Sequence, residues 1–121
     1  MGNLKFDFER INKSKEFTYL YNEGRRYVSV FFIVFLKKDA SYAKRVGVVA
    51  SKKIGKAVLR NKAKRRMKEV MRLSKEYIKA GTSIVLVARK PVITADFKLL
   101  IETFQNILEK FYQYEDNKQN S

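Results

Sequence analysis

Residues 45–72 read RVGVVASKKIGKAVLRNKAKRRMKEVMR, a β-branched apolar run followed directly by a long basic run. Residues 45–51 have the composition of a β-strand, and Gly47 within them indicates a bulge or a close approach to the backbone. From about residue 57 onward, the apolar side chains recur every three or four positions, which is typical of an amphipathic helix. The stretch therefore predicts a fold that mixes strands and helices, with a strongly cationic helix after a strand.

A second strand candidate precedes this stretch. Residues 26–37, RYVSVFFIVFLK, are dense in β-branched and aromatic side chains, as strands are. Alternate residues of a strand point to opposite faces of the sheet. This divides the run into two apolar sets: Phe31, Ile33 and Phe35 on one side, and Phe32, Val34 and Leu36 on the other. The strand is therefore either buried on both faces or carries an exposed aromatic patch on one of them.

The remaining segments complete an α+β pattern. Ser14 is suited to cap a helix over about 15–22, and Gly24 to end it as a left-handed residue. The other expected elements are a turn over 38–43, a strand over 83–89 that Pro91 ends, and helices over about 57–79 and 95–112. The order α-β-β-α-β-α predicts an α+β sandwich, in which helices pack on one sheet.

The composition is uniform over most of the 121 residues, which predicts a single domain over residues 1–114. Residues 1–13 are mixed and polar, and we expect a loosely held N-terminal arm there. Residues 115–121 are polar, and we expect them to form a frayed tail.

Charge and missing residue types narrow the function. Lys and Arg number 27 against 12 Asp and Glu, a net charge of +15, which indicates a polyanionic partner such as nucleic acid or an acidic membrane surface. The absence of Cys and His excludes disulfides, thiolate zinc sites and His-based catalysis. No apolar run is long enough to cross a membrane, and the N-terminus lacks the apolar region of a signal peptide, which predicts a cytoplasmic protein.

The basic run forms one broad face of its helix. Residues 52–72 hold ten basic residues and a single acid, Glu69, so the helix forgoes the ion pairs that normally stabilise a solvated face. At about 100° per residue, the basic side chains spread over one side. The opposite side gathers an apolar seam that we expect to pack on the core: Leu59, Ala63, Met67, Val70 and Met71.

The start of this helix lacks the acidic residues and the good capping residue that helices usually have there. The helix dipole favours acids in the first turn, yet this turn is entered through lysines, and Gly55 is the best available cap. A bound phosphate would supply the missing negative charge, and the amide of Asn61 could donate to and accept from RNA. A solvated charge run is the alternative. We favour a polyanion site, with these predicted RNA-binding residues: Lys52, Lys53, Lys56, Arg60, Asn61, Lys64, Arg65 and Lys68.

RNA fits this site better than DNA or a membrane. The apolar seam lacks the run of large side chains that inserts into lipid, and no DNA-binding motif is present. Phe17, Tyr21 and Phe35 offer platforms on which unpaired bases could stack, which favours single-stranded RNA.

Residues 45–65 closely resemble the signature of the bacterial ribonuclease P protein subunit, whose basic helix carries an Arg-Asn-Arg-type motif. Residues 84–91, IVLVARKP, are similar to that family's strand ending in Ala-Arg-Lys-Pro, and a weaker match runs from Lys15 through Tyr21 to Gly24. The resemblance implies an RNA-binding domain with an α-β-β-β-α-β-α sandwich similar to a ribosomal-protein domain. It also implies a left-handed β-α-β crossover, of the kind that most folds avoid, and a strand or strand pair in place of the single run over 26–37.

The resemblance implies a binding subunit without catalytic residues, metal ligands or cofactors of its own. The RNA subunit would hold the Mg²⁺ ions and cleave precursor tRNA to form its 5′ end, while the protein contacts that RNA and the 5′ leader. The leader would lie in a cleft lined by Phe17, Tyr21 and Phe35, and five residues match the basic-helix motif: Lys53, Arg60, Asn61, Lys64 and Arg65. Lys62 and Lys68 stand where the family often has arginine, and Lys56 where it often has asparagine.

Two other functions compete with this one. A ribosomal or general RNA-binding protein of similar fold would explain the positive charge equally well. Only the long motif distinguishes the two functions. A self-contained nuclease needs clustered carboxylates for Mg²⁺, whereas the 12 acids are scattered and the predicted strands contain none. The long motif over residues 45–65 favours the ribonuclease P subunit.

Overall fold

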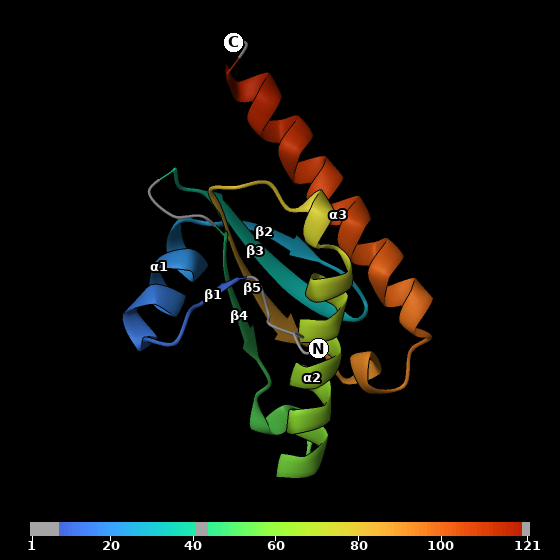
Figure 1. The fold of residues 1–121 in the computed structure, drawn as a ribbon. Helices are drawn as coiled ribbons and strands as arrows, with labels where there is room; N and C mark the ends of the chain where they lie inside the picture. The colour runs from blue at the N-terminus through green and yellow to red at the C-terminus, as the bar shows by residue number, and fades with distance from the viewer. Residues whose placement is uncertain (1–7, 41–43, 120–121) are drawn as a thin grey trace, which may run out of the picture.

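The computed structural model of the protein describes residues 8–40 and 44–119. In these residues a five-stranded sheet has the order β1-β4-β5-β3-β2, with helices on both faces (Figure 1). The strands are β1 (Glu9–Arg10), β2 (Arg25–Val28), β3 (Phe32–Lys38), β4 (Lys44–Val49) and β5 (Thr82–Ala88). The helices are α1 (Ser14–Glu23), α2 (Ala57–Leu73) and α3 (Phe97–Gln119), with short 3₁₀ turns η1 (Lys52–Ile54), η2 (Lys75–Tyr77) and η3 (Lys90–Ile93).

The last strand in the sequence lies at the centre of the sheet. β5 pairs in parallel with β4 and antiparallel with β3, so the chain leaves β4, passes through α2 and returns beside β4. Helices α2 and α3 cover one face of the sheet, and α1 lies on the other (Figure 1). This is the predicted α+β sandwich, with the extra strand that the family resemblance implies.

The two apolar sets of the predicted strand have different surroundings. Phe32, Val34 and Leu36 are fully buried beneath α2 and α3. Ile33 and Phe35 are only partly buried, because α1 is short and covers part of its face of the sheet. Phe31, expected on the same side, precedes β3 in the turn and packs instead against the core beneath α2 and α3, so its predicted placement is wrong. Of the two interpretations left open by the sequence, the partly exposed aromatic face is the one observed.

The run over 26–37 is a hairpin and not one strand. Ser29 turns the chain: its Oγ accepts hydrogen bonds from the backbone N–H groups of Phe31 and Phe32, at 3.2 and 3.1 Å. β2 then pairs antiparallel with β3. The serine side chain thus adds to the backbone hydrogen bond from Ser29 N–H to the Phe32 carbonyl, at 3.0 Å, which strand composition alone does not indicate.

Two predictions about the ends of α1 are wrong. Ser14 is the first helical residue and Lys13 the cap, while the carboxylate of Glu16 accepts the Lys13 N–H at 3.3 Å. Gly24 is extended, with φ −80°, and is not left-handed. A glycine is needed there for space, because a Cβ would lie 2.5 Å from the carbonyl oxygen of Leu20.

The later helices differ from their predicted lengths in opposite directions. α2 ends at Leu73 and not near residue 79, because Ser74 is buried and the chain tightens into η2 to bring Ile78 into the core. α3 continues to Gln119, so residues 115–119 are helical and not a frayed tail. The Arg25 guanidinium lies 3.7 Å from the centre of the Tyr114 ring and holds this end of α3 against β2. Residues 120–121 lie outside the described residues.

The N-terminal arm is ordered from residue 8 onward, contrary to the prediction. Phe8 and Ile11 are buried, and β1 between them pairs in parallel with Arg45 and Val46 of β4. The apolar residues that hold this segment are too few to produce a recognisable strand pattern. Residues 1–7 of the predicted arm lie outside the described residues, as do residues 41–43 of the predicted turn.

Candidate RNA interface

The apolar seam of α2 faces the core as predicted. Ala63, Met67, Val70 and Met71 are buried, and Leu59 packs against the same core. Burial of this seam fixes the rotation of the helix and therefore the directions of the cationic residues between its members.

The turn before α2 has a different cap from the predicted one. Lys56 is the N-cap and makes no side-chain cap hydrogen bond, while Gly55 ends η1 with φ 134°. This positive φ is a conformation that glycine adopts without strain. The Arg60 guanidinium donates to the Gly55 carbonyl at 2.7 Å and so ties η1 to α2. Lys52, Lys53 and Lys56 remain exposed at this end of the helix, and its first turn holds no acid.

A hollow of about 220 Å³ separates α2 from β1 and β4; we call it the basic hollow. Arg10, Lys64 and Lys68 line it, and no acidic residue does among those that the structure describes. Its complete lining is Arg10, Ile11, Asn12, Val46, Gly47, Val48, Lys64, Lys68 and Met71. Burial lowers the pKa of Lys68, and the charges of Arg10 and Lys64 lower it further. An anion bound here would relieve this repulsion, as phosphate does in nucleic-acid sites.

A second hollow of about 410 Å³ lies on the outer side of α2; we call it the outer hollow. It is lined by Asn61, Lys64, Arg65, Lys68, Glu69 and Arg72. Arg72 binds both carboxylate oxygens of Glu69, at 2.8 and 2.5 Å, so the acid is already neutralised. Lys64 and Lys68 line both hollows. The structure therefore brings together four predicted RNA-binding residues, Asn61, Lys64, Arg65 and Lys68.

The predicted leader-binding aromatics also lie together, on the α1 face of the sheet. The ring centre of Tyr21 is 6.4 Å from that of Phe17 and 5.0 Å from that of Phe35. Tyr21 is 39% exposed, and Phe17 and Phe35 are half-buried, whereas Leu20 is only 2% exposed and anchors α1. We call Phe17, Tyr21 and Phe35 the aromatic patch. Burial raises the pKa of Tyr21, so its hydroxyl stays neutral at physiological pH.

Gly47 connects the aromatic patch to the basic hollow. It lines the hollow, and a Cβ at this position would lie 2.7 Å from the Phe17 ring. β4 continues its pairing with β5 through this residue without a bulge. The close approach predicted for Gly47 is therefore confirmed, and this one residue approaches Phe17 on the α1 face while also lining the basic hollow beside α2.

Sequence reasoning misses two arginines beside these surfaces. Arg10 falls in the predicted loose arm, and only its pairing with β4 brings it to Lys64 and Lys68. Arg26 is exposed and pairs in register with Phe35, so it lies on the same face at the edge of the sheet. The doublet Arg25-Arg26 before an apolar strand is the available signal.

Other classes of site find no support in the described ranges. Residues 8–40 and 44–119 contain no group of three Asp or Glu side chains placed to hold a metal ion. No helix in the same ranges combines the length and the apolar character needed to cross a bilayer.

Known proteins resemble the chain over most of its length. The family model for ribonuclease P matches residues 7–112. The ribonuclease P protein component of Caldanaerobacter subterraneus is 33% identical over 109 residues, which cover 90% of this chain and 94% of that protein. The ribonuclease P protein component of Clostridioides difficile is 34% identical over 108 residues, covering 86% of this chain and 95% of that protein.

Solved structures agree with these matches. The ribonuclease P protein of Thermotoga maritima superposes with a TM-score of 0.74 at 32% identity, covering 84% of this chain and 96% of that one. The Staphylococcus aureus protein gives 0.71 at 31% identity, covering 83% and 92%. Another S. aureus structure is of a mutant with defective mRNA degradation activity. Because the family model spans most of the chain and relatives above 30% identity align over up to 90% of it, this chain belongs to the ribonuclease P protein family.

Proposed function

We propose that this chain binds the catalytic RNA of ribonuclease P through the cationic face of α2 and so assists 5′ maturation of tRNA. The observation that carries the proposal is the convergence of Arg10, Lys64 and Lys68 on a hollow whose lining, as far as the structure describes it, includes no acid. These residues come from two segments far apart in the sequence, and a bound anion would relieve the repulsion among them. A phosphate backbone supplies such anions at regular spacing.

The aromatic patch is proposed to bind the single-stranded 5′ leader of precursor tRNA. Each exposed ring offers a face on which an unpaired base stacks, independent of base identity. The neighbouring cationic residues would then hold the leader phosphates. Mature tRNA has no leader, so this surface would discriminate between substrate and product.

The chemistry of cleavage is assigned to the RNA subunit, which would hold the Mg²⁺ ions. This chain would contribute positioning and charge neutralisation, and it would act in a cytoplasmic ribonucleoprotein. A purely ribosomal or general RNA-binding role shares the cationic face, but the family match over residues 7–112 favours ribonuclease P.

The experiment is a magnesium titration of precursor tRNA cleavage by a ribonuclease P RNA, with and without the purified chain. We expect the protein to lower the magnesium concentration needed for half-maximal cleavage, and we expect no cleavage by the protein without the RNA. A Lys64→Gln/Lys68→Gln variant should lose most of this effect. The matched control is Lys98→Gln/Lys110→Gln, which removes the same charge from exposed positions on α3.

An unchanged magnesium requirement in the presence of the folded protein would contradict the proposal. Correctly placed cleavage by RNA-free protein would contradict the assignment of the chemistry to the RNA.

A further inference from the structure

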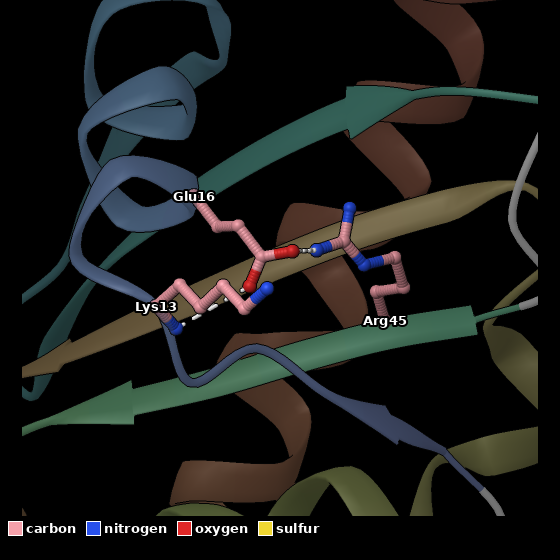
Figure 2. A network of polar contacts seen from close by, with 3 residues as sticks. All are labelled: Lys13, Glu16 and Arg45. Atoms are coloured by element: carbon pink, nitrogen blue, oxygen red, sulfur yellow. Dashed lines mark hydrogen bonds and ion pairs between the residues drawn. The ribbon is translucent and has the colours of Figure 1, made fainter.

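An arginine is buried under α1, on the opposite side of the sheet from the cationic helix. Arg45 is the second residue of β4 and only 8% exposed. Its guanidinium forms an ion pair with the carboxylate of Glu16 on α1 (Figure 2). A guanidinium removed from water is costly unless it is paired, so the position of Glu16 is tied closely to that of β4.

The Glu16 carboxylate also holds the start of its own helix. Its second oxygen accepts the N–H of Lys13, the N-cap of α1 (Figure 2). Burial opposes ionisation of this carboxyl, but the Lys13 N–H and the charge of Arg45 outweigh it and keep its pKa below the usual value. One carboxylate thus joins the first turn of α1 to the second residue of β4.

The next residue of α1 makes the second contact with β4. Phe17 follows Glu16, and its ring occupies the space where a Cβ of Gly47 would lie. Gly47 is two residues beyond Arg45 and therefore on the same face of the strand. An ionic contact and an aromatic contact, side by side, set where α1 lies along β4.

The remaining packing of α1 is on β3 and β5, mainly through Leu20, which shares a small apolar cluster with Ile11 and Val85. Leu20 is the only buried residue of this helix, all of which the structure describes, and a hollow of about 340 Å³ lies on the side of α1 away from Phe17. This hollow is lined by Lys15, Glu16, Tyr19, Leu20, Lys37, Asp39, Arg45 and Ser83. The ion pair therefore lies at the edge of this open hollow, beside the buried side chain of Leu20.

We propose that Glu16 and Arg45 are positioning residues for leader recognition. Their pair, with the Phe17–Gly47 contact, sets the location of α1 and hence the spacing of Phe17 and Tyr21 from Phe35. Stacking depends on this spacing, because a base needs a ring face presented at contact distance. The inference rests on the proposed function of the aromatic patch as the leader site.

The test uses the holoenzyme, assembled from the full chain and a ribonuclease P RNA. Dissociation constants are measured for precursor tRNA and for mature tRNA, well below the melting temperature of every variant. Glu16→Gln removes the charge and keeps the shape, Arg45→Lys keeps the charge and loses the planar fork, and Gly47→Ala displaces the Phe17 ring without changing any charge. Glu115→Gln is the matched control, because it breaks an ion pair with Lys118 on α3 and changes the net charge equally.

We expect Glu16→Gln and Gly47→Ala to weaken precursor binding about tenfold, the size of losing one stacked base, while mature tRNA binding changes less than about twofold. Arg45→Lys should fall between these variants and the wild type. Glu115→Gln should alter neither constant. The ring centres of Tyr21 and Phe35 are 5.0 Å apart. The NMR cross-peak between these two rings should weaken in Glu16→Gln and persist in Glu115→Gln.

The outcomes separate the inference from the function on which it rests. If Phe17→Ala weakens precursor binding selectively but Glu16→Gln and Gly47→Ala do not, the positioning role is overturned and the leader site stands. If Phe17→Ala and Tyr21→Ala leave precursor binding unchanged, the leader site itself is wrong. If Glu16→Gln fails to fold, Gly47→Ala and Arg45→Lys decide the question. A lowered melting temperature with no selective loss for precursor would show that the pair serves stability alone.

Discussion

The Nε atom of Arg66 donates to the backbone carbonyl of Val92 at 2.9 Å, which binds α2 to η3. The same guanidinium donates to the carbonyl of Ala95 and lies 5.2 Å from the centre of the Phe97 ring. Arg65, the preceding residue, is exposed and lines the outer hollow. Adjacent arginines of one helix therefore have different roles, one within the fold and one toward a partner.

The first prediction follows from this contrast. Arg65→Glu should weaken binding to ribonuclease P RNA and reduce the slope of log affinity against log salt by roughly 0.7–0.9 for each phosphate that the arginine neutralises. Its stability should stay within about 0.5 kcal/mol of the wild type. Arg66→Met should instead destabilise the fold by about 1–3 kcal/mol, because two backbone carbonyls are left without a charged donor.

Filter binding over a salt series and urea unfolding measure these two effects. Normal RNA binding by Arg65→Glu, with an unchanged salt slope, would show that the cationic face is not the RNA site.

The second prediction concerns the aromatic patch. Tyr21→Ala and Phe35→Ala should lower affinity for precursor tRNA by about 1–3 kcal/mol for each base that no longer stacks, and leave affinity for mature tRNA unchanged. Their melting temperatures should fall far less than that of Phe104→Ala, a fully buried ring whose removal costs about 3–5 kcal/mol. Thermal unfolding and binding to both RNAs provide the measurements. Large stability losses without a precursor-specific defect would assign these rings to the core.

The third prediction concerns the buried hydroxyl that joins α3 to the sheet. Tyr112 Oη lies 2.8 Å from Thr82 Oγ1 and accepts the N–H of Lys79 at 2.9 Å. Tyr112→Phe leaves both groups without this partner and should cost about 1–3 kcal/mol in unfolding free energy. RNA binding should be unaffected, because Tyr112 lines neither the basic hollow nor the outer hollow. Denaturant unfolding alongside RNA titration checks both statements, and an unchanged midpoint would contradict the first.

Alkaline titration provides a second measurement on the same residue. Burial raises the pKa of Tyr112 above its ordinary value of 10.0, although the hydrogen bonds with Thr82 and Lys79 act in the opposite direction. A raised pKa in the folded state means that stability is fully present below pH 10 and falls as the pH rises through the folded value. The stability difference between wild type and Tyr112→Phe should therefore shrink above that pH.

The fourth prediction is a pH dependence at Glu16. Its pKa lies below the ordinary value of 4.5, so its charge stabilises the folded state above that pH, and this contribution disappears as the pH falls through the folded value. The difference in unfolding free energy between wild type and Glu16→Gln should be constant near neutral pH and shrink below pH 4.5. Urea unfolding from neutral to acidic pH measures it. Asp39→Asn is the control, because it removes one carboxylate from the lining of the same hollow without touching the ion pair of Glu16 with Arg45. A difference that is independent of pH would contradict the ionic role of Glu16.

The periodicity of apolar residues is enough to predict the buried face of an element when one pattern runs through the whole element. The alternation of Phe32, Val34 and Leu36 identifies the buried face of β3, and the seam from Ala63 to Met71 identifies the buried face of α2. In these elements burial of apolar side chains contributes most to stability, and the spacing of those side chains is visible in the sequence.

Predictions fail where a few long-range contacts decide the structure. β1 forms because Phe8 packs into the large core cluster and Ile11 into the smaller cluster with Leu20 and Val85. α3 continues past residue 112 because Tyr114 contacts Arg25 of β2. In both examples the segments in contact are far apart in the sequence. The left-handed conformation predicted for Gly24 is the usual one at helix ends, whereas the carbonyl groups of Leu20 and Leu36 here require the absence of a side chain.

The candidate site likewise contains some residues that the sequence identifies and others that only long-range contacts bring to it. The cationic residues of α2 can be named from their spacing on one helix, but Arg10 reaches them only through the pairing of β1 with β4. The pairing of Glu16 with Arg45 likewise depends on how α1 lies on the sheet. Contacts between segments thus determine the part of the site that the sequence does not indicate.

The central place of β5 has a consequence for how the protein is made. During synthesis β1 to β4 emerge in order before β5, yet β3 and β4 are not neighbours in the sheet, because β5 lies between them. Until Thr82–Ala88 leaves the ribosome, the nascent chain holds two sheet fragments with unpaired edges and no shared core. The aromatic patch includes Phe35 of β3, whereas the basic hollow is lined by residues of β1 and β4, on the other side of β5. Their complete arrangement therefore forms only after the last strand has been inserted, so an unfinished chain presents no finished RNA surface.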